Sequence, residues 1–391
     1  MTRPVLIKKI SVLLITFFCL FPIFAETITD TDYGYSLDLP EGYEIKDYSE
    51  DGTSYFLQHP NIPVSLIMKV VKDDKGTSNT VLKNQMNKLN AKTDLDNFDW
   101  NNTKCSVGKF SMILDQSYAG WSVCAPLQTK GYYLSLICYA PEEKELGCEQ
   151  FIFSTLNSLS TDMENYNTPG IIVTYAFPKE GTKNITLDIN GNKVYTFIDK
   201  SDEEASQWIV DMEYAVLTLY GKHNMWKKAW QRYYRMIYRD SFGRLENVSA
   251  DIYDALWFNI KSKNPKNPEI AYAQELLSWV QNFDYYRGEK SSDSDFTSLP
   301  RMLAGTGNDC DSRSMLICML LKTLGIESIM IFSPQYSHAM ACTLIDAPGQ
   351  TFKLPGTNLE FIMGETTAHV TWGMISKEHS DRSKWIEVLL P

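Results

Sequence analysis

The sequence predicts an α+β protein in which two folded parts are joined by a polar segment. Four observations indicate this architecture. Strand-like stretches alternate with helical periodicity up to about residue 160, and residues 161–170 have the Asn, Thr, Pro and Gly content of a linker. From residue 310 onward, a helix followed by apolar strands is predicted. The 391 residues exceed one ordinary core, since domains average about 150 residues.

Residues 1–25 have the pattern of a signal peptide. Three basic residues precede an apolar run from Ile10 to Phe21, and the small residue Ala25 follows. The run is about a dozen residues, shorter than the roughly 20 that span a bilayer, so a permanent anchor is the weaker alternative. We expect cleavage near Ala25, giving a secreted or periplasmic protein without a permanent membrane span.

The charge of the mature chain excludes one class of partner. Removing three basic residues from the total of 37 leaves 34 against 48 acidic residues, a net charge of −14. Nucleic-acid binding needs a concentrated basic face, and no basic cluster stands out in the sequence. We therefore expect no nucleic-acid partner and interpret the acidity as a solubility feature.

Seven cysteines remain after cleavage, in a compartment that permits disulfides. Four fall in the N-terminal part and are able to form two bridges, whereas three fall in the C-terminal part: Cys105, Cys124, Cys138 and Cys148, then Cys310, Cys318 and Cys342. Because seven is odd, at least one thiol stays unpaired within the chain. An odd cysteine in a secreted protein is a candidate reactive thiol.

Residues 26–160 are predicted to form one α+β domain. Strands are expected at residues 35–39, 54–58, 64–71, 109–116, 119–126 and 131–140, and helices at residues 78–89 and 148–159. The opening YGYSLDLPEGY at residues 33–43 and the order of elements resemble the PsbP-like fold, a small α/β sandwich. No acid, base or metal constellation is present, which favours a binding or positioning module.

Residues 161–265 are interpreted as a linker, strands and helices that lead into the next domain. Strand-like runs are expected at residues 171–177 and 193–198, followed by helical sequence over residues 202–242. Apolar residues recur there at steps of three and four, which is the core-facing side of an amphipathic helix. This aromatic-rich face is interpreted as core packing and not as a ligand site.

Cys310 has the position of a nucleophile. Two glycines and an Asn-Asp pair precede it, and apolar residues then mark one helical face, so Cys310 lies in the first turn of a helix. A helix start presents about half a positive charge, and cysteines there commonly have lowered pKa values. We therefore expect a thiolate, although a small buried cysteine near a helix start is an equally good interpretation of this feature alone.

His338 and Glu365 are the candidate partners of this thiol. His338 begins a predicted strand at residues 338–345, and a second strand at residues 359–366 is expected to pair with it as an antiparallel hairpin. Pairing about residue 352 brings Glu365 beside the imidazole. Asp346 lies eight residues from His338 along its strand, roughly 26 Å at about 3.3 Å per residue, and is too far to orient the ring.

Four segments together resemble the transglutaminase-like superfamily: WVQNFDY at residues 279–285, GNDCDSRS at 307–314, SHA at 337–339 and GETT at 364–367. The resemblance covers residues 271–373 and implies a papain-like core, which we assign to residues 266–391. It implies Cys310 as nucleophile and His338 as general base. The family usually has Asp as the third member, whereas Glu365 stands here. By analogy Gln281 is the candidate oxyanion donor, with Trp279 as the alternative.

The predicted architecture is therefore a papain-like transglutaminase core preceded by a small α/β sandwich domain. The predicted function is an exported cysteine enzyme that hydrolyses or transfers an amide or peptide acyl group through a Cys310 thioester. Hydrolysis is preferred over cross-linking, and a protein or peptide is the expected substrate, with cell-wall peptide as one candidate.

The alternative is a catalytically inactive binding or assembly module on the same fold. A metal site of Cys310, His338 and Cys342 is disfavoured because closely spaced ligand pairs are absent. No phosphate-binding or cofactor motif is present, so neither a cofactor nor a metal is expected.

Overall fold

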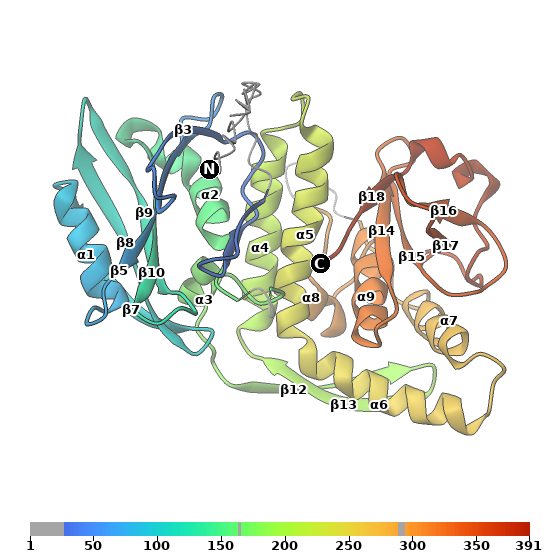
Figure 1. Cartoon of the computed structure of the whole chain (residues 1–391). Helices are drawn as coiled ribbons and strands as arrows, with labels where there is room; N and C mark the ends of the chain where they lie inside the picture. The colour runs from blue at the N-terminus through green and yellow to red at the C-terminus, as the bar shows by residue number, and fades with distance from the viewer. Residues whose placement is uncertain (1–26, 163–165, 288–293) are drawn as a thin grey trace, which may run out of the picture.

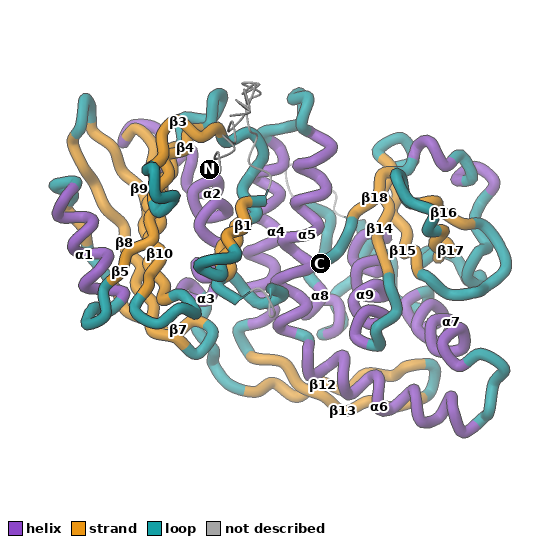
Figure 2. The backbone as a smooth tube through the Cα atoms, in the orientation of Figure 1, coloured by secondary structure: helices purple, strands orange, loops and turns teal. Residues whose placement is uncertain are grey.

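The protein places two β-sheets on either side of a central group of helices (Figure 1). The structure, a computed structural model, describes residues 27–162, 166–287 and 294–391. The α+β class is confirmed, with helices and several sheets in the described ranges (Figure 2). Within those ranges no helix is long and apolar enough to cross a membrane. The predicted signal peptide at residues 1–25 lies outside the described residues.

The N-terminal part is an antiparallel sheet with one helix on each face (Figure 1). Its strands follow the order β3-β4-β5-β10-β9-β8-β6, and β7 also pairs with β8. The strands are β3 (Glu44–Tyr48), β4 (Ser54–Gln58), β5 (Ser65–Lys72), β6 (Lys92–Thr93), β7 (Asp96–Trp100), β8 (Thr103–Ile113), β9 (Ser117–Pro126) and β10 (Tyr132–Pro141). The helices are α1 (Ser78–Lys88), which begins at a Thr77 capping box, and α2 (Glu142–Asn157).

A small three-stranded sheet also belongs to this part of the chain. It consists of β1 (Ile28–Asp30), β2 (Tyr35–Leu37) and β11 (Leu159–Ser160). The strand predicted at residues 171–177 is wrong: this run forms helix α3 (Ile171–Ala176). The side chain of Asn157 accepts hydrogen bonds from the backbone N–H groups of Ile172 and Val173, at 3.2 and 3.1 Å. This tertiary cap stabilises a short helix whose apolar, β-branched sequence favours a strand.

The central region contains a hairpin and three helices. The hairpin is β12 (Thr182–Ile189) and β13 (Asn192–Asp199), and the helices are α4 (Asp202–Thr218), α5 (Trp226–Arg244) and α6 (Glu246–Ser262). The helical region predicted at residues 202–242 is therefore two helices, broken around Gly221. Figure 1 shows α4 and α5 side by side between the two large sheets, with α6 and the hairpin below them.

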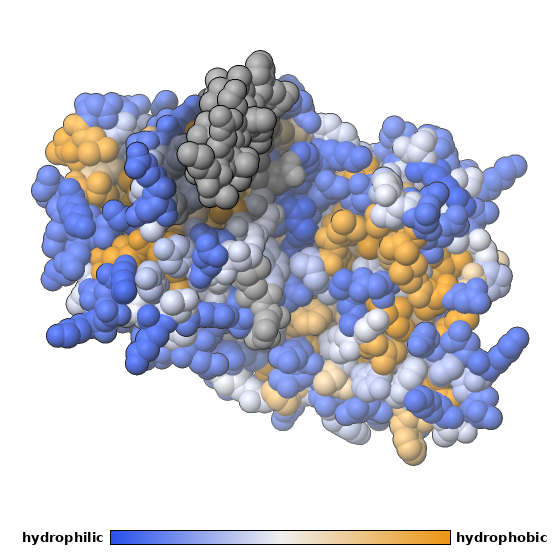
Figure 3. All heavy atoms as spheres, viewed as in Figure 1, coloured by the Kyte–Doolittle hydropathy of each residue, from blue (hydrophilic) through white to orange (hydrophobic). Residues whose placement is uncertain are grey.

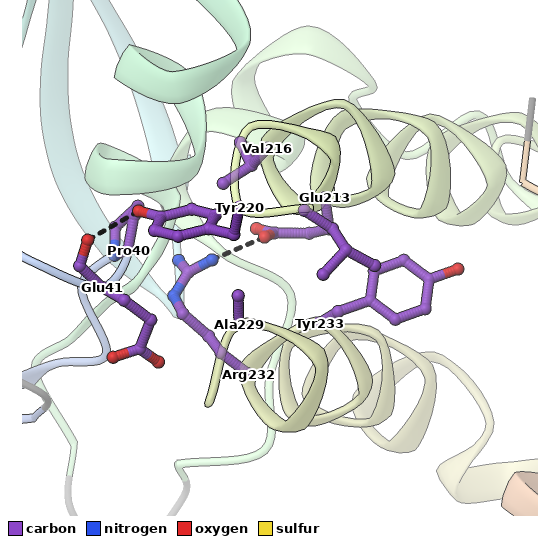
Figure 4. A pocket seen from close by; sticks show the side chains of 9 residues that line it. Pro40, Glu41, Glu213, Val216, Tyr220, Ala229, Arg232 and Tyr233 are labelled. Atoms are coloured by element: carbon purple, nitrogen blue, oxygen red, sulfur yellow. Dashed lines mark hydrogen bonds and ion pairs between the residues drawn. The ribbon is translucent and has the colours of Figure 1, made fainter. Parts of the chain in front are cut away.

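A buried ionic network joins α4 and α5 to the N-terminal part (Figure 4). Arg232 donates to Glu213 Oε2 at 2.6 Å and to the carbonyl of Asp38 at 2.8 Å. The hydroxyl of Tyr220 donates to the carbonyl of Glu41 at 2.6 Å. The cavity between these groups measures about 10 Å³, roughly one water molecule. This network serves as a structural link, since nothing larger than a water molecule fits within it.

The C-terminal part packs helices against a five-stranded antiparallel sheet of order β16-β17-β15-β14-β18. The elements are α7 (Pro268–Val280), α8 (Leu299–Leu303), α9 (Cys310–Thr323), β14 (Ser328–Ser333), β15 (His338–Thr343), β16 (Thr351–Lys353), β17 (Glu360–Gly364), η1 (Lys377–His379), η2 (Arg382–Lys384) and β18 (Ile386–Val388). Helix α9 covers one face of the sheet. The other face carries its own apolar cluster, and hydrophobic residues gather over this part of the molecule in Figure 3.

One continuous hydrophobic core extends from Tyr35 to Leu390 and includes residues of all three predicted regions. The predicted domain boundaries after residues 160 and 265 stay predictions. The seven cysteines in the described ranges are all buried and free, so the bridges considered for the N-terminal part are not present. Three of those four N-terminal cysteines lie within sheet strands, where they pack as small apolar side chains.

Candidate active site

Cys310 is the first residue of α9, as predicted from the sequence. Asp309 caps this helix: its Oδ1 accepts hydrogen bonds from the backbone N–H and the hydroxyl of Ser312, at 3.0 and 2.8 Å. The apolar residues that follow are buried and pack α9 against β14 and β15. Cys310 itself is only 2% exposed. The helix therefore holds the thiol at a fixed position beside the start of β15.

The contacts of the thiol differ from the prediction. Cys310 Sγ donates to Asp311 Oδ1 at 3.3 Å, and no hydrogen bond joins it to His338 in the described structure. Asp311 is held by Tyr234, whose hydroxyl donates to Oδ2 at 2.7 Å. The backbone N–H of Ala339, the residue after His338, donates toward the sulfur. The thiol thus lies next to the first residues of β15, with a carboxylate as its acceptor.

The predicted lowering of the Cys310 pKa is wrong for this resting arrangement. Burial raises the pKa of the thiol, and the carboxylates of Asp311 and Asp309 raise it further. The helix start contributes only about half a positive charge, which does not offset desolvation and two adjacent acidic groups. Cys310 is therefore a protonated thiol at neutral pH until its surroundings change.

His338 and Glu365 are brought together as the sequence predicted. His338 Nε2 lies 2.9 Å from Glu365 Oε2 and 3.1 Å from Oε1. Thr367 donates to Oε1 from its backbone N–H at 2.9 Å and from its hydroxyl at 2.6 Å. Burial disfavours the Glu365 carboxylate, but the hydrogen bond and charge of His338, together with Thr367, lower its pKa to about 2. Glu365 is therefore ionised and orients the imidazole, leaving Nδ1 available.

The hairpin that produces this contact forms, but its register differs by one residue from the predicted pairing about residue 352. β15 pairs antiparallel with β17, with Ala341 opposite Gly364 and Thr343 opposite Ile362. The last pair of this ladder is Ala341 with Gly364, so His338 lies three residues before the paired part of β15 and Glu365 lies one residue after the paired part of β17. The additional methylene of Glu relative to Asp supplies reach at this position.

Gln281 makes contacts that differ from its predicted role as an oxyanion donor. Its amide nitrogen donates to the carbonyl of Glu365 at 2.8 Å and to the carbonyl of Val370 at 3.0 Å. Two carbonyl acceptors identify this atom as nitrogen and use both of its protons. No proton remains for an oxyanion, so in this structure Gln281 fixes the segment that carries Glu365. Trp279, the alternative donor, lines a groove of about 300 Å³ to which Cys310 does not contribute.

Arg313 holds three segments around the site together. This side chain, 2% exposed, donates to Asn308 Oδ1 at 2.7 Å, to the carbonyl of Phe283 at 2.6 Å and to the carbonyl of Thr366 at 3.2 Å. Its guanidinium also lies over the ring of Tyr285, 5.3 Å from the centroid. Three of the four segments that carry the family resemblance are thus fixed to one another through a single buried cation.

His379 adds a third ionisable side chain to the His338–Glu365 pair. Its Nδ1 lies 3.9 Å from Glu365 Oε2, and the His338 and His379 rings are 4.9 Å apart between centroids. Burial, followed by the nearby His338, lowers the pKa of His379. Tyr336 and Trp385 pack against these rings and form an aromatic wall.

No protein-family model matches the sequence, and no curated protein is similar to it. Among solved structures, the chain is similar to the cyanobacterial PsbP protein CyanoP from Synechocystis sp. PCC 6803, with 13% identity and a TM-score of 0.30, covering 34% of this chain and 91% of that one. A Bacteroides thetaiotaomicron VPI-5482 protein is similar with 10% identity and a TM-score of 0.20, covering 56% of this chain and 78% of that one.

The CyanoP similarity agrees with the PsbP-like resemblance expected for the N-terminal part.

Three residues of the site were not predicted from the sequence: Asp311, Tyr234 and His379. Asp311 is adjacent to Cys310, so its proximity was visible in the sequence, but its contact with the sulfur was not. Tyr234 lies 77 positions before Asp311 and belongs to a helix interpreted as core packing. His379 falls in a short 3₁₀ turn without hydrophobic periodicity, so no pattern indicates that it faces the site.

Proposed function

We propose that the C-terminal part is a transglutaminase-like, papain-related cysteine enzyme that cleaves or transfers amide bonds of an exported protein or peptide. The observation that supports it most is the bidentate contact of the ionised Glu365 with His338 Nε2. A carboxylate on one imidazole nitrogen selects the tautomer whose other nitrogen is a base. That base lies at the start of β15, against which the Cys310 helix packs.

The chemistry starts with a rotation of the Cys310 side chain from Asp311 toward His338. His338 Nδ1 accepts the thiol proton as sulfur attacks the carbonyl carbon of the amide. The tetrahedral oxyanion is stabilised by backbone donors, for which the N–H groups of Cys310 and Ala339 are candidates. The departing amine takes the proton from His338 and leaves a thioester on Cys310.

Resolution of the thioester releases the product. His338 removes a proton from water, the hydroxide adds to the thioester carbonyl, and the carboxylic acid leaves as the proton returns to sulfur. An amine acceptor in place of water gives transfer instead. Hydrolysis remains our preferred outcome because water is abundant outside the cell.

A specific observation favours the alternative of an inactive binding module. The resting thiol donates to Asp311, and its pKa is raised by burial and by two carboxylates. A scaffold has no need of a reactive thiol, and such an arrangement keeps it unreactive. The two functions differ in one property: only the enzyme requires that His338 accelerate reactions of Cys310.

Alkylation kinetics separate the two functions without a known substrate. Iodoacetamide labelling of Cys310 is followed by peptide mapping at pH 8 in the wild type, His338→Ala and Glu365→Gln, with His369→Ala as a control at an exposed histidine. General-base assistance is commonly worth about 10²-fold or more, so labelling of His338→Ala is expected to be slower by at least about tenfold. Equal labelling rates in all four proteins would contradict the enzyme and support the inactive binding module.

A further inference from the structure

We infer that His338, Glu365 and His379 form a binding site for a divalent transition-metal ion of the zinc type, and that its occupation removes His338 as a base. The metal-binding part stands on the geometry of three side chains. The inhibitory part rests on the proposed function, because only an enzyme has an activity to lose.

The three side chains have the spacing of a metal site. One ligand atom from each lies within 4.8 Å of the others, and the closest pairs are His338 Nε2 to Glu365 Oε2 at 2.9 Å and His379 Nδ1 to the same oxygen at 3.9 Å. Ligands bonded to zinc at about 2.0–2.2 Å in a tetrahedron lie about 3.4 Å apart. The observed separations bracket this value, so small side-chain rotations suffice to coordinate an ion.

The chemistry of the ligand set also fits. Two imidazoles and one carboxylate are a known ligand combination of zinc sites that keep a fourth position for solvent. His379 Nδ1 is buried and has no hydrogen-bond partner in the described structure, although a buried imidazole nitrogen ordinarily has one. A metal ion would satisfy this nitrogen, which points toward Glu365.

The surroundings hold the two rings in place for coordination. Tyr336 packs on His379 with centroids 5.0 Å apart, and Trp385 lies edge-on to His379 at 6.1 Å. The indole N–H of Trp385 donates to the carbonyl of His379 at 2.9 Å and fixes the backbone of the turn. Outer groups of this kind orient metal-binding histidines and strengthen metal affinity.

Metal binding at Nε2 and base function at Nδ1 place incompatible demands on the protonation of the same imidazole ring. Without metal, His338 Nε2 carries the proton that Glu365 accepts, and Nδ1 is the base. With metal on Nε2, the ring proton moves to Nδ1, and the imidazole can no longer accept the proton of Cys310. The ion therefore acts as a reversible inhibitor that competes with the Glu365–His338 hydrogen bond.

Equilibrium dialysis against Zn²⁺ tests the binding part independently of any activity. The proteins are the full-length mature wild type, His379→Ala, Glu365→Gln and the control His369→Ala. Each protein is measured untreated and also after its cysteines have been blocked with methyl methanethiosulfonate under denaturing conditions and the chain refolded, so that zinc bound by thiols is recognised. We expect one equivalent of Zn²⁺ in the wild type and His369→Ala. Loss of one ligand should weaken binding by more than the roughly 10–100-fold typical of outer-group changes.

Cobalt substitution and alkylation complete the test. Co²⁺ at this site should give visible absorption of tetrahedral intensity in the wild type that is absent in His379→Ala. Equal metal content in His379→Ala and wild type, or equal losses in His379→Ala and His369→Ala, would overturn the inference. Zinc that binds as expected but does not slow the His338-dependent alkylation of Cys310 would contradict only the inhibitory part. The metal site and the proposed function can therefore fail separately.

Discussion

Glu41 carries a buried carboxyl group at the junction between the N-terminal part and helices α4 and α5. The residue is 3% exposed, and its backbone carbonyl accepts hydrogen bonds from Tyr220 and His59. In Figure 4 its carboxylate points away from Arg232, which is paired with Glu213. Burial raises the pKa of Glu41 to about 7, although Arg232 opposes the increase. We predict that Glu41→Gln stabilises the protein at alkaline pH.

The magnitude and the sign follow from proton linkage. Raising a pKa from 4.5 to about 7 corresponds to about 3 kcal/mol, at 1.36 kcal/mol for each pKa unit. Below pH 4.5 the carboxyl is protonated in both states and has no effect. Between pH 4.5 and 7 the folded state binds more protons than the unfolded state, so stability falls as pH rises. Above pH 7 the full destabilisation is present, and Glu41→Gln removes it.

Urea unfolding at pH 5 and pH 8, followed by tryptophan fluorescence, measures this difference. Glu41→Gln should exceed the wild type in unfolding free energy by up to about 3 kcal/mol at pH 8 and by much less at pH 5. Glu44→Gln is the matched control, because that partly exposed carboxylate pairs with Lys46. A Glu41→Gln protein that is no more stable than wild type at pH 8, or a gain independent of pH, would show that the buried Glu41 carboxylate does not destabilise the fold.

Three further substitutions test the construction of the site. Asp311→Asn removes a carboxylate that raises the Cys310 pKa. Iodoacetamide labelling of Cys310 at pH 8 should therefore accelerate, roughly tenfold for each unit by which the Cys310 pKa falls, and a slower reaction would contradict this. Arg313→Met leaves three buried acceptors without a donor and should lower the unfolding free energy, measured in urea, by about 3–5 kcal/mol. Arg382→Met is the exposed control, and an equal effect of the two substitutions would contradict this. Gln281→Met leaves the carbonyls of Glu365 and Val370 without their donor and should lower the unfolding free energy in urea by about 2–4 kcal/mol; an unchanged unfolding free energy would contradict this.

Local patterns were enough to predict the parts of the site that local sequence determines. Asp309 has the side chain of an N-cap and precedes a run of apolar residues, so the helix start at Cys310 follows from the chain itself. The antiparallel pairing of β15 and β17 follows from two apolar strands separated by a polar loop. The His338–Glu365 contact was therefore accessible from spacing alone.

Features that depend on burial or on distant segments were not accessible. The Cys310 pKa was predicted in the wrong direction because the carboxylates of Asp309 and Asp311 were visible in the sequence but the desolvation of the thiol was not. Gln281 binds two backbone carbonyls that lie 84 and 89 positions away. The helix α3 depends on a cap from Asn157, which no local propensity reveals.

We propose that Cys310 and His338 act as one catalytic unit. Mass spectrometry after incubation with a peptidyl acyloxymethyl ketone, an electrophile that resembles a scissile carbonyl, measures whether they do. We expect one adduct per wild-type chain, mapped to Cys310, and adduct formation slower by about 10²-fold in His338→Ala. Adducts formed at equal rates in both proteins, or at cysteines other than Cys310, would contradict it.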